Sequence, residues 1–232
     1  MVPSEKEHKS IDPIWEEKYS SNLDINRYPW DSIVSWIFRN VDKTKLKELN
    51  ILEVGCGTAN NLWFAAREGF NVYGIDGSES AINYAKKRFS AEDLQGELIV
   101  GDITILPFKT NFFDLVIDRA AITCLSEDNA KKCFSEIHRV SKLNGKFFFN
   151  PYSDHNSSMS SGIRTNNDLV DDIKSGSVFG AGKIRFYSKK DILSHFEQGW
   201  LIEKLHHCVV TDMKSQLSDI QAEWRVSLKK IS

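Results

Sequence analysis

The sequence predicts a single α/β domain: a doubly wound, mostly parallel sheet of seven strands with one antiparallel edge strand and helices on both faces. Three observations lead to this prediction. Short runs rich in β-branched residues alternate with segments of helical periodicity, which is typical of strand–helix–strand units. The last run, residues 224–228, instead alternates apolar with polar residues, as an antiparallel strand with one solvated face does. The chain has 232 residues, enough for one α/β domain with a sizeable core.

The chain is organised around residues 50–61, which read as a strand, a glycine turn and the start of a helix. The first five of these residues form the apolar run of a buried parallel strand. Gly55 and Gly57 allow positive φ angles and let a ligand approach the bare backbone. The N–H groups of the following helix would then face an anionic group held over the turn.

A second predicted strand, residues 71–75, ends on Asp76, about 20 residues past the glycines, where nucleotide-binding folds place an acid for the ribose hydroxyls. A glycine turn alone would also fit a tight connection without a ligand. Together with an acid in this position, the turn indicates a nucleotide-like cofactor.

The residues from Glu53 to Thr58 resemble the first motif of the small-molecule class I S-adenosylmethionine-dependent methyltransferases, an acid and an apolar residue followed by a glycine-rich turn. Ala59 replaces the third glycine of that motif, a mild departure because a small side chain still lets a ligand come close. The resemblance extends from about residue 50 to residue 150 and includes Asp76, the turn at 101–103 and the strand at 113–118. It implies a Rossmann-like sheet and S-adenosyl-L-methionine as the cofactor.

The resemblance also implies roles for individual residues. The backbone of Gly55 and Gly57 would lie near the methionine carboxylate of the cofactor, Asp76 at the ribose, and the turn at 101–103 at the adenine. Asp118 and Arg119, at the end of the fourth strand, would lie near the sulfonium. The full set of expected cofactor-binding residues is Tyr19, Trp30, Glu53, Gly55, Cys56, Gly57, Asn60, Asp76, Gly77, Ser78, Asp102, Ile103, Asp118 and Arg119. Cys56 fits equally well as a small buried side chain without chemistry.

Residues 1–49 are rich in aromatic side chains and are expected to form an N-terminal helical cap. Apolar residues from Trp30 to Val41 follow helical spacing, so this segment should pack one face on the core. In similar methyltransferases such a segment folds over the cofactor, with Tyr19 and Trp30 as the expected contacts. Simple surface packing is the alternative. Residues 50–150 would then form the cofactor-binding core.

Residues 151–187 should lie on the acceptor side, because they leave the sheet after the fifth strand. The stretch from 153 to 182 is rich in Ser, Asn, Asp and Gly, and is either a lid or a disordered insertion. The side chains expected to bind the acceptor are Tyr152, His155, Arg164 and Tyr187. Residues 188–232 would supply a helix and the last strands.

Composition narrows the classes of partner. The formal net charge of −2 gives no broad phosphate-binding surface, so nucleic acid is an unlikely partner. The chain shows neither a charged-then-apolar leader nor the ~18-residue apolar run of a membrane span, so we expect a cytoplasmic protein. Its four cysteines have no paired spacing, and we expect neither a metal site nor a disulfide.

The sequence therefore predicts a methyltransferase that acts on the oxygen or nitrogen of a polar small molecule. An NAD-linked oxidoreductase would share the glycine turn and the distal acid, but no Tyr-x-x-x-Lys pair is present. A catalytically silent, cofactor-binding regulatory module is a third interpretation. The sequence assigns no catalytic residue, acceptor or oligomeric state.

Overall fold

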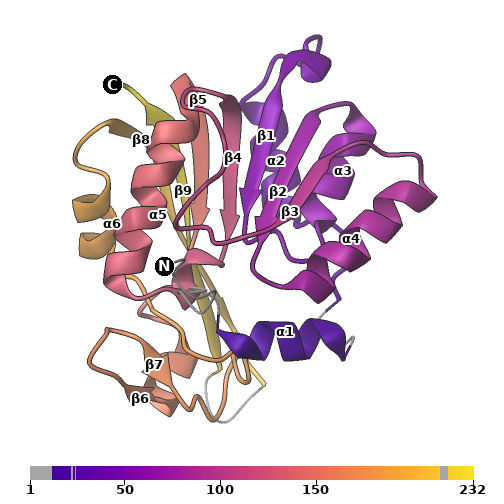
Figure 1. Ribbon diagram of the computed structural model, residues 1–232. Coiled ribbons are helices and arrows are strands. Elements are labelled where there is room, and N and C mark those ends of the chain that lie inside the picture. Colours follow the sequence, from indigo (N-terminus) through magenta and orange to yellow (C-terminus); the bar gives the residue numbers. More distant parts are fainter. Residues whose placement is uncertain (1–11, 22, 24, 215–218) are drawn as a thin grey trace, which may run out of the picture.

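Seven strands form one sheet in the order β3-β2-β1-β4-β5-β9-β8 (Figure 1). The computed structural model describes residues 12–21, 23, 25–214 and 219–232. Five neighbouring strands pair in parallel: β1 (Asn50–Val54), β2 (Asn71–Asp76), β3 (Glu97–Val100), β4 (Phe113–Arg119) and β5 (Ser141–Asn150). The strand β9 (Ile220–Lys230) runs antiparallel to both β5 and β8 (Trp200–Thr211). This mostly parallel sheet confirms the predicted fold class, with the antiparallel strand second from the edge.

Helices cover both faces of the sheet. On one face, α2 (Asp31–Arg39), α3 (Asn60–Glu68) and α4 (Glu79–Ala91) pack on the strands around a core that includes Ile37, Leu62, Ile82, Leu115 and Phe148. On the other face, α5 (Glu127–Val140) and α6 (Lys189–His195) share a second core with Val116, Phe147 and Phe149. Because both faces are covered, the central strands read as continuous apolar runs.

Two further segments lie beyond the carboxyl ends of the parallel strands. Helix α1 (Pro13–Ser20) runs across this edge below the other helices, and β6 (Ile163–Arg164) and β7 (Val170–Asp171) form a small second sheet beside it (Figure 1). The remaining elements are the 3-10 helices η1 (Leu46–Glu48), η2 (Ile122–Cys124) and η3 (Ser157–Ser161). Of these segments, α1 contributes Trp15 and Tyr19 to the cavities beside the glycine turn.

Residues 153–182 form an ordered part of the fold. They contribute Val170, Ile173 and Val178 to a third apolar cluster, which Ile184 and Phe186 complete. The stretch has few apolar residues, but those few meet at one point and give it a core of its own. The disordered alternative therefore does not hold for this segment.

The strand β9 also differs from the prediction of one solvated face. Ser227 on that face is 4% exposed and accepts a hydrogen bond from Nε1 of Trp36 at 2.9 Å. Helix α2 therefore covers the polar side of the strand. Among the described residues, no helix is long and apolar enough to cross a membrane.

Candidate functional site

Two adjoining cavities open at the carboxyl edge of the sheet. The first has a volume of about 220 Å³ and is lined by residues at or after the ends of β1, β2, β3 and β4, including Asp76, Asp102 and Ile103. The second is lined by the glycine turn, the N-terminal segment and Tyr152. The residues common to both are Trp15, Tyr19, Gly55, Arg119 and Ala120. The two cavities are therefore parts of one cleft.

The glycine turn has a backbone that only glycine accommodates. Gly57 has a φ of +52°, and a Cβ atom built on it would lie 2.5 Å from Oη of Tyr19. Gly55 has a φ of +63°, and its Cβ would lie 2.1 Å from that of Ala121. The turn thus brings bare backbone to the cleft, and any side chain at either position would collide with the wall.

Glu53 brings a buried acid to the second cavity. Its Oε1 accepts a hydrogen bond from Nδ2 of Asn61 at 2.6 Å, whereas Oε2 is buried and has no hydrogen-bond partner among the described residues. Burial raises the pKa of Glu53 to about 8, because removal from water disfavours the carboxylate. A cation at this point would supply the missing partner.

Asp76 holds the glycine turn in place. One of its oxygens accepts from the N–H of Gly57 at 2.8 Å and the other from the N–H of Ser78 at 2.8 Å. Burial raises the pKa of Asp76, and these two hydrogen bonds oppose that effect. A carboxylate has about four acceptor sites, so Asp76 keeps capacity to accept hydrogen bonds from a ligand.

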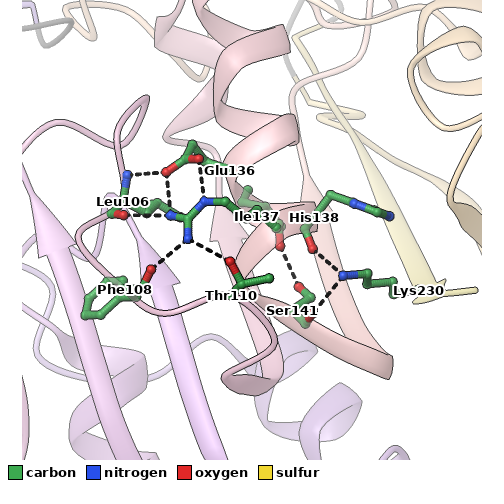
Figure 2. Close-up of polar contacts among 9 residues, drawn as sticks. Leu106, Phe108, Thr110, Glu136, Ile137, His138, Ser141 and Lys230 are labelled. Carbon is green, nitrogen blue, oxygen red and sulfur yellow. Dashed lines mark hydrogen bonds and ion pairs between the residues drawn. The ribbon is translucent and has the colours of Figure 1, made fainter. Parts of the chain in front are cut away.

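The loop after β3, which carries Asp102 and Ile103, is clamped to α5 (Figure 2). Arg139 donates to the carbonyl oxygens of Leu106 and Phe108, each at 2.8 Å. Glu136 accepts from the N–H of Leu106 at 2.7 Å and pairs with Arg139. Both backbone polar groups of Leu106 are therefore fixed by side chains of one helix.

Hydrogen bonds join the N-terminal segment to the glycine turn and to the start of α3. Thr58 donates to the carbonyl oxygen of Asn26 at 3.1 Å, and Asn60 donates to that of Tyr28 at 2.7 Å. Asn61 accepts from the N–H of Trp30 at 3.0 Å. The N-cap of α3 is Ala59, which has a φ of 55° and makes no side-chain cap bond.

A separate set of hydrogen bonds, made by Glu16, holds helix α1 in place. Its carboxylate accepts from Oγ of Ser78 at 2.6 Å and from the hydroxyl and N–H of Ser80, at the start of α4. These hydrogen bonds lower the pKa of Glu16. They hold Trp15 and Tyr19, from the same helix, against both cavities.

Most of the predicted cofactor residues line the cleft, and two do not. The residues on its walls are Tyr19, Trp30, Glu53, Gly55, Cys56, Gly57, Asn60, Asp76, Gly77, Asp102, Ile103 and Arg119. Ser78 is fully buried and caps α4 by accepting from the N–H of Ala81. Asp118 is fully buried and accepts from the N–H groups of Ala121 and Ile122. Neither side chain lines either cavity, and each instead accepts hydrogen bonds from nearby backbone N–H groups.

Only Tyr152 of the four predicted acceptor residues lines either cavity. His155 is exposed and packs its ring against that of His207, and Arg164 is exposed on β6. Tyr187 is fully buried, and its ring packs against that of Phe149. These three residues lie outside both cavities, and their role in binding the acceptor stays a prediction.

Sequence reasoning missed several side chains of the cleft. Trp15, Asn61 and Ala121 line it or support it, and Glu16 fastens the helix above it. For Trp15, the sequence signal was the large number of aromatic residues in the N-terminal segment. The others carry no signal, since their roles depend on how distant segments meet.

Comparisons with known proteins agree with this geometry. A family model described as a methyltransferase domain matches residues 51–145. An uncharacterized protein of Haemophilus influenzae is 32% identical over 113 residues, which are 47% of this chain and 44% of that protein. A putative methyltransferase of Geobacillus is 29% identical over 136 residues, which are 56% of this chain and 53% of that protein. The chain thus spans about half the length of the curated relatives it matches.

The fold has solved counterparts. The structure of a SAM-dependent methyltransferase from Methanosarcina mazei matches 84% of this chain and 97% of that chain, with a TM-score of 0.68 and 15% sequence identity. At this identity the likeness shows the fold alone. Over residues 51–145, this chain is therefore similar to a methyltransferase domain, and these residues contain the glycine turn, Asp76 and the 101–103 turn.

Proposed function

We propose that this chain transfers the methyl group of S-adenosylmethionine to an oxygen or nitrogen atom of a polar small molecule. The observation that carries the proposal is the single cleft in which a glycine turn, a buried acid without a full set of partners and the clamped 101–103 turn all meet. Its residues fit the cofactor in charge and in shape.

The chain offers a partner for each part of the cofactor. Oε2 of Glu53 suits the ammonium group, and the glycine turn at the N-terminus of α3 suits the carboxylate. Asp76 keeps acceptor capacity for the ribose hydroxyls. Asp102, whose Oδ1 accepts from the N–H and hydroxyl of Thr104, and the side chain of Ile103 suit the adenine.

When bound, S-adenosylmethionine supplies an electrophilic methyl group: a lone pair of the acceptor forms the new bond to carbon while the carbon–sulfur bond breaks and its electrons remain on sulfur. The task of the protein is to align the acceptor with that methyl group, which can provide much of the acceleration. Trp15 and Tyr19 cover the cleft from α1 and exclude water. Tyr152, at the end of β5, and Arg119, at the end of β4, form the wall on the acceptor side.

A turnover assay tests the proposal. The purified chain is incubated with S-adenosylmethionine and panels of small hydroxy compounds, amines and carboxylic acids, and the demethylated cofactor product is measured. We expect acceptor-dependent product from at least one polar panel. Tight cofactor binding with no transfer to any acceptor would favour a regulatory module, and reduction of NAD by a substrate alcohol would favour an oxidoreductase.

A further inference from the structure

Arg119 is the one cation on the wall of the second cavity, among the lining residues that the structure describes. Its side chain is only 9% exposed. The guanidinium carbon lies 4.2 Å from the ring centroid of Trp30 and 6.0 Å from that of Tyr152. Arginine stacked on aromatic rings keeps its planar group oriented and its charge intact. Arg119 is thus a positive group fixed in position at the cleft.

The charge of Arg119 is only partly neutralised inside the protein. Nη2 lies 3.3 Å from Oε2 of Glu223, and Nε has no hydrogen-bond partner. Glu223 also pairs with Arg225 at 2.8 Å, so two guanidinium groups share one carboxylate. Glu53, the one acid among the described residues of the same wall, accepts from Asn61 and interacts electrostatically with Arg119. Arg119 has five N–H donors, so its contact with Glu223 leaves capacity to donate to a ligand.

Arg119 lines both cavities, and the strand order places it on the side of the cleft opposite the groups that suit the ribose and the adenine. Asp76 and the 101–103 turn follow β2 and β3, on one side of β1, whereas Arg119 and Tyr152 follow β4 and β5, on the other side. Ala181 and Ile184 complete the wall beside them. A molecule seated there would meet an arginine, two aromatic rings and a small apolar surface.

We propose that the methyl acceptor is a small carboxylic acid whose carboxylate binds Arg119 between Trp30 and Tyr152. This inference rests on the proposed function and adds the substrate class to it. A carboxylate accepts two parallel hydrogen bonds from a guanidinium, which provides both orientation and affinity. Glu223 holds the arginine from behind, and the aromatic rings select a flat molecule.

The test is a calorimetric titration of benzoate, with benzamide as the neutral molecule of the same shape. Each is titrated into the protein with and without saturating S-adenosylhomocysteine. We expect benzoate to bind about tenfold or more tightly than benzamide, since a charge-assisted pair is lost in the amide. Arg119→Gln should abolish that preference, and Arg119→Lys should restore part of it, because it keeps the charge without the planar fork.

The control variant is Arg39→Gln, which removes the same charge from an exposed position at the far end of α2. It should leave both titrations unchanged. Equal binding of benzoate and benzamide by the wild type would overturn the proposal, as would a preference that survives Arg119→Gln. A loss of S-adenosylhomocysteine affinity in Arg119→Gln with benzoate binding intact would assign Arg119 to the cofactor. Failure of the wild type to bind S-adenosylhomocysteine would count against the proposed function, while the benzoate titration without it still tests the acceptor class.

Discussion

At the scale of single residues, Glu53 shows how burial changes the pKa of a carboxyl group that is placed to bind a ligand. Burial raises its pKa to about 8 from an ordinary 4.5, so the carboxyl group is mostly protonated at neutral pH. An ammonium group beside Oε2 favours the carboxylate and lowers the pKa again. Cofactor binding at pH 7 should therefore release a proton.

We predict that the affinity for S-adenosylmethionine rises between pH 6 and about pH 8 and falls above that range, because the free amino group of the cofactor loses its own proton near there. Glu53→Gln cannot release a proton, and should bind about tenfold or more weakly with little dependence on pH in that window. Calorimetry in buffers of different ionisation enthalpy measures the released proton. Proton release that persists in Glu53→Gln would assign the linkage to another group.

The same pKa sets a dependence of stability on pH. Between pH 4.5 and about 8 the folded protein keeps a proton on Glu53 that the unfolded chain releases. The free energy of unfolding of the cofactor-free protein should therefore fall as pH rises through this window. Urea titrations of the wild type and Glu53→Gln should show a smaller fall in the variant, and parallel curves would contradict this role.

Single residues also show which positions of the site the motif spacing can predict. Motif spacing located Asp76 and the 101–103 turn, because each directly follows a parallel strand. It did not separate Asp118 from Arg119, since successive side chains of a strand point to opposite faces. Asp118 faces the buried side with α5, and Arg119 faces the cleft.

At the scale of elements, the clamp from α5 positions the adenine side of the cleft. Arg139→Lys keeps the charge but cannot donate to Leu106, Phe108 and Glu136 at once. We expect the dissociation constant for S-adenosylmethionine to rise about three- to tenfold, because the loop that carries Asp102 is less fixed.

Calorimetry of the variant checks this, with Arg67→Lys, on the exposed surface of α3, as the matched control. A lower melting temperature with an unchanged dissociation constant would show that the clamp serves stability alone.

Helix α1 is the second element whose position matters. Glu16→Gln removes the charge that binds the two serines at the start of α4, where a negative group is favoured. We expect the cofactor to dissociate about tenfold faster, because α1 covers both cavities. Stopped-flow tryptophan fluorescence measures this rate. Glu17→Gln, on the exposed face of the same helix, should behave as the wild type. Equal rates in both variants would show that α1 does not control release.

These elements also mark the limit of sequence reasoning. Helix α2 was predictable because its apolar residues follow helical spacing, and this apolar face is buried in the core. Helix α1 has no fully buried residue, and its position depends on Glu16 meeting two serines more than sixty residues away. The order of residues 153–182 likewise depends on a few apolar side chains that meet only after folding.

At the scale of the whole molecule, the sheet was predictable because each strand and helix is a local pattern, and because parallel strands joined by helices have few possible arrangements. The cleft follows from that arrangement, since the loops after β1, β2, β3 and β4 meet at one edge. What closes the cleft comes from segments far apart in the chain, and only the structure shows it.

The central claim is that this cleft binds S-adenosylmethionine, and calorimetric titration tests it most directly. The wild type is titrated with S-adenosylmethionine, S-adenosylhomocysteine and NAD, and Asp102→Ala is titrated in parallel, because it alters the adenine side without entering the core. We predict one site that binds both sulfur compounds, at least about tenfold weaker binding in the variant, and no heat with NAD. Binding of NAD with no heat from either sulfur compound would contradict the account.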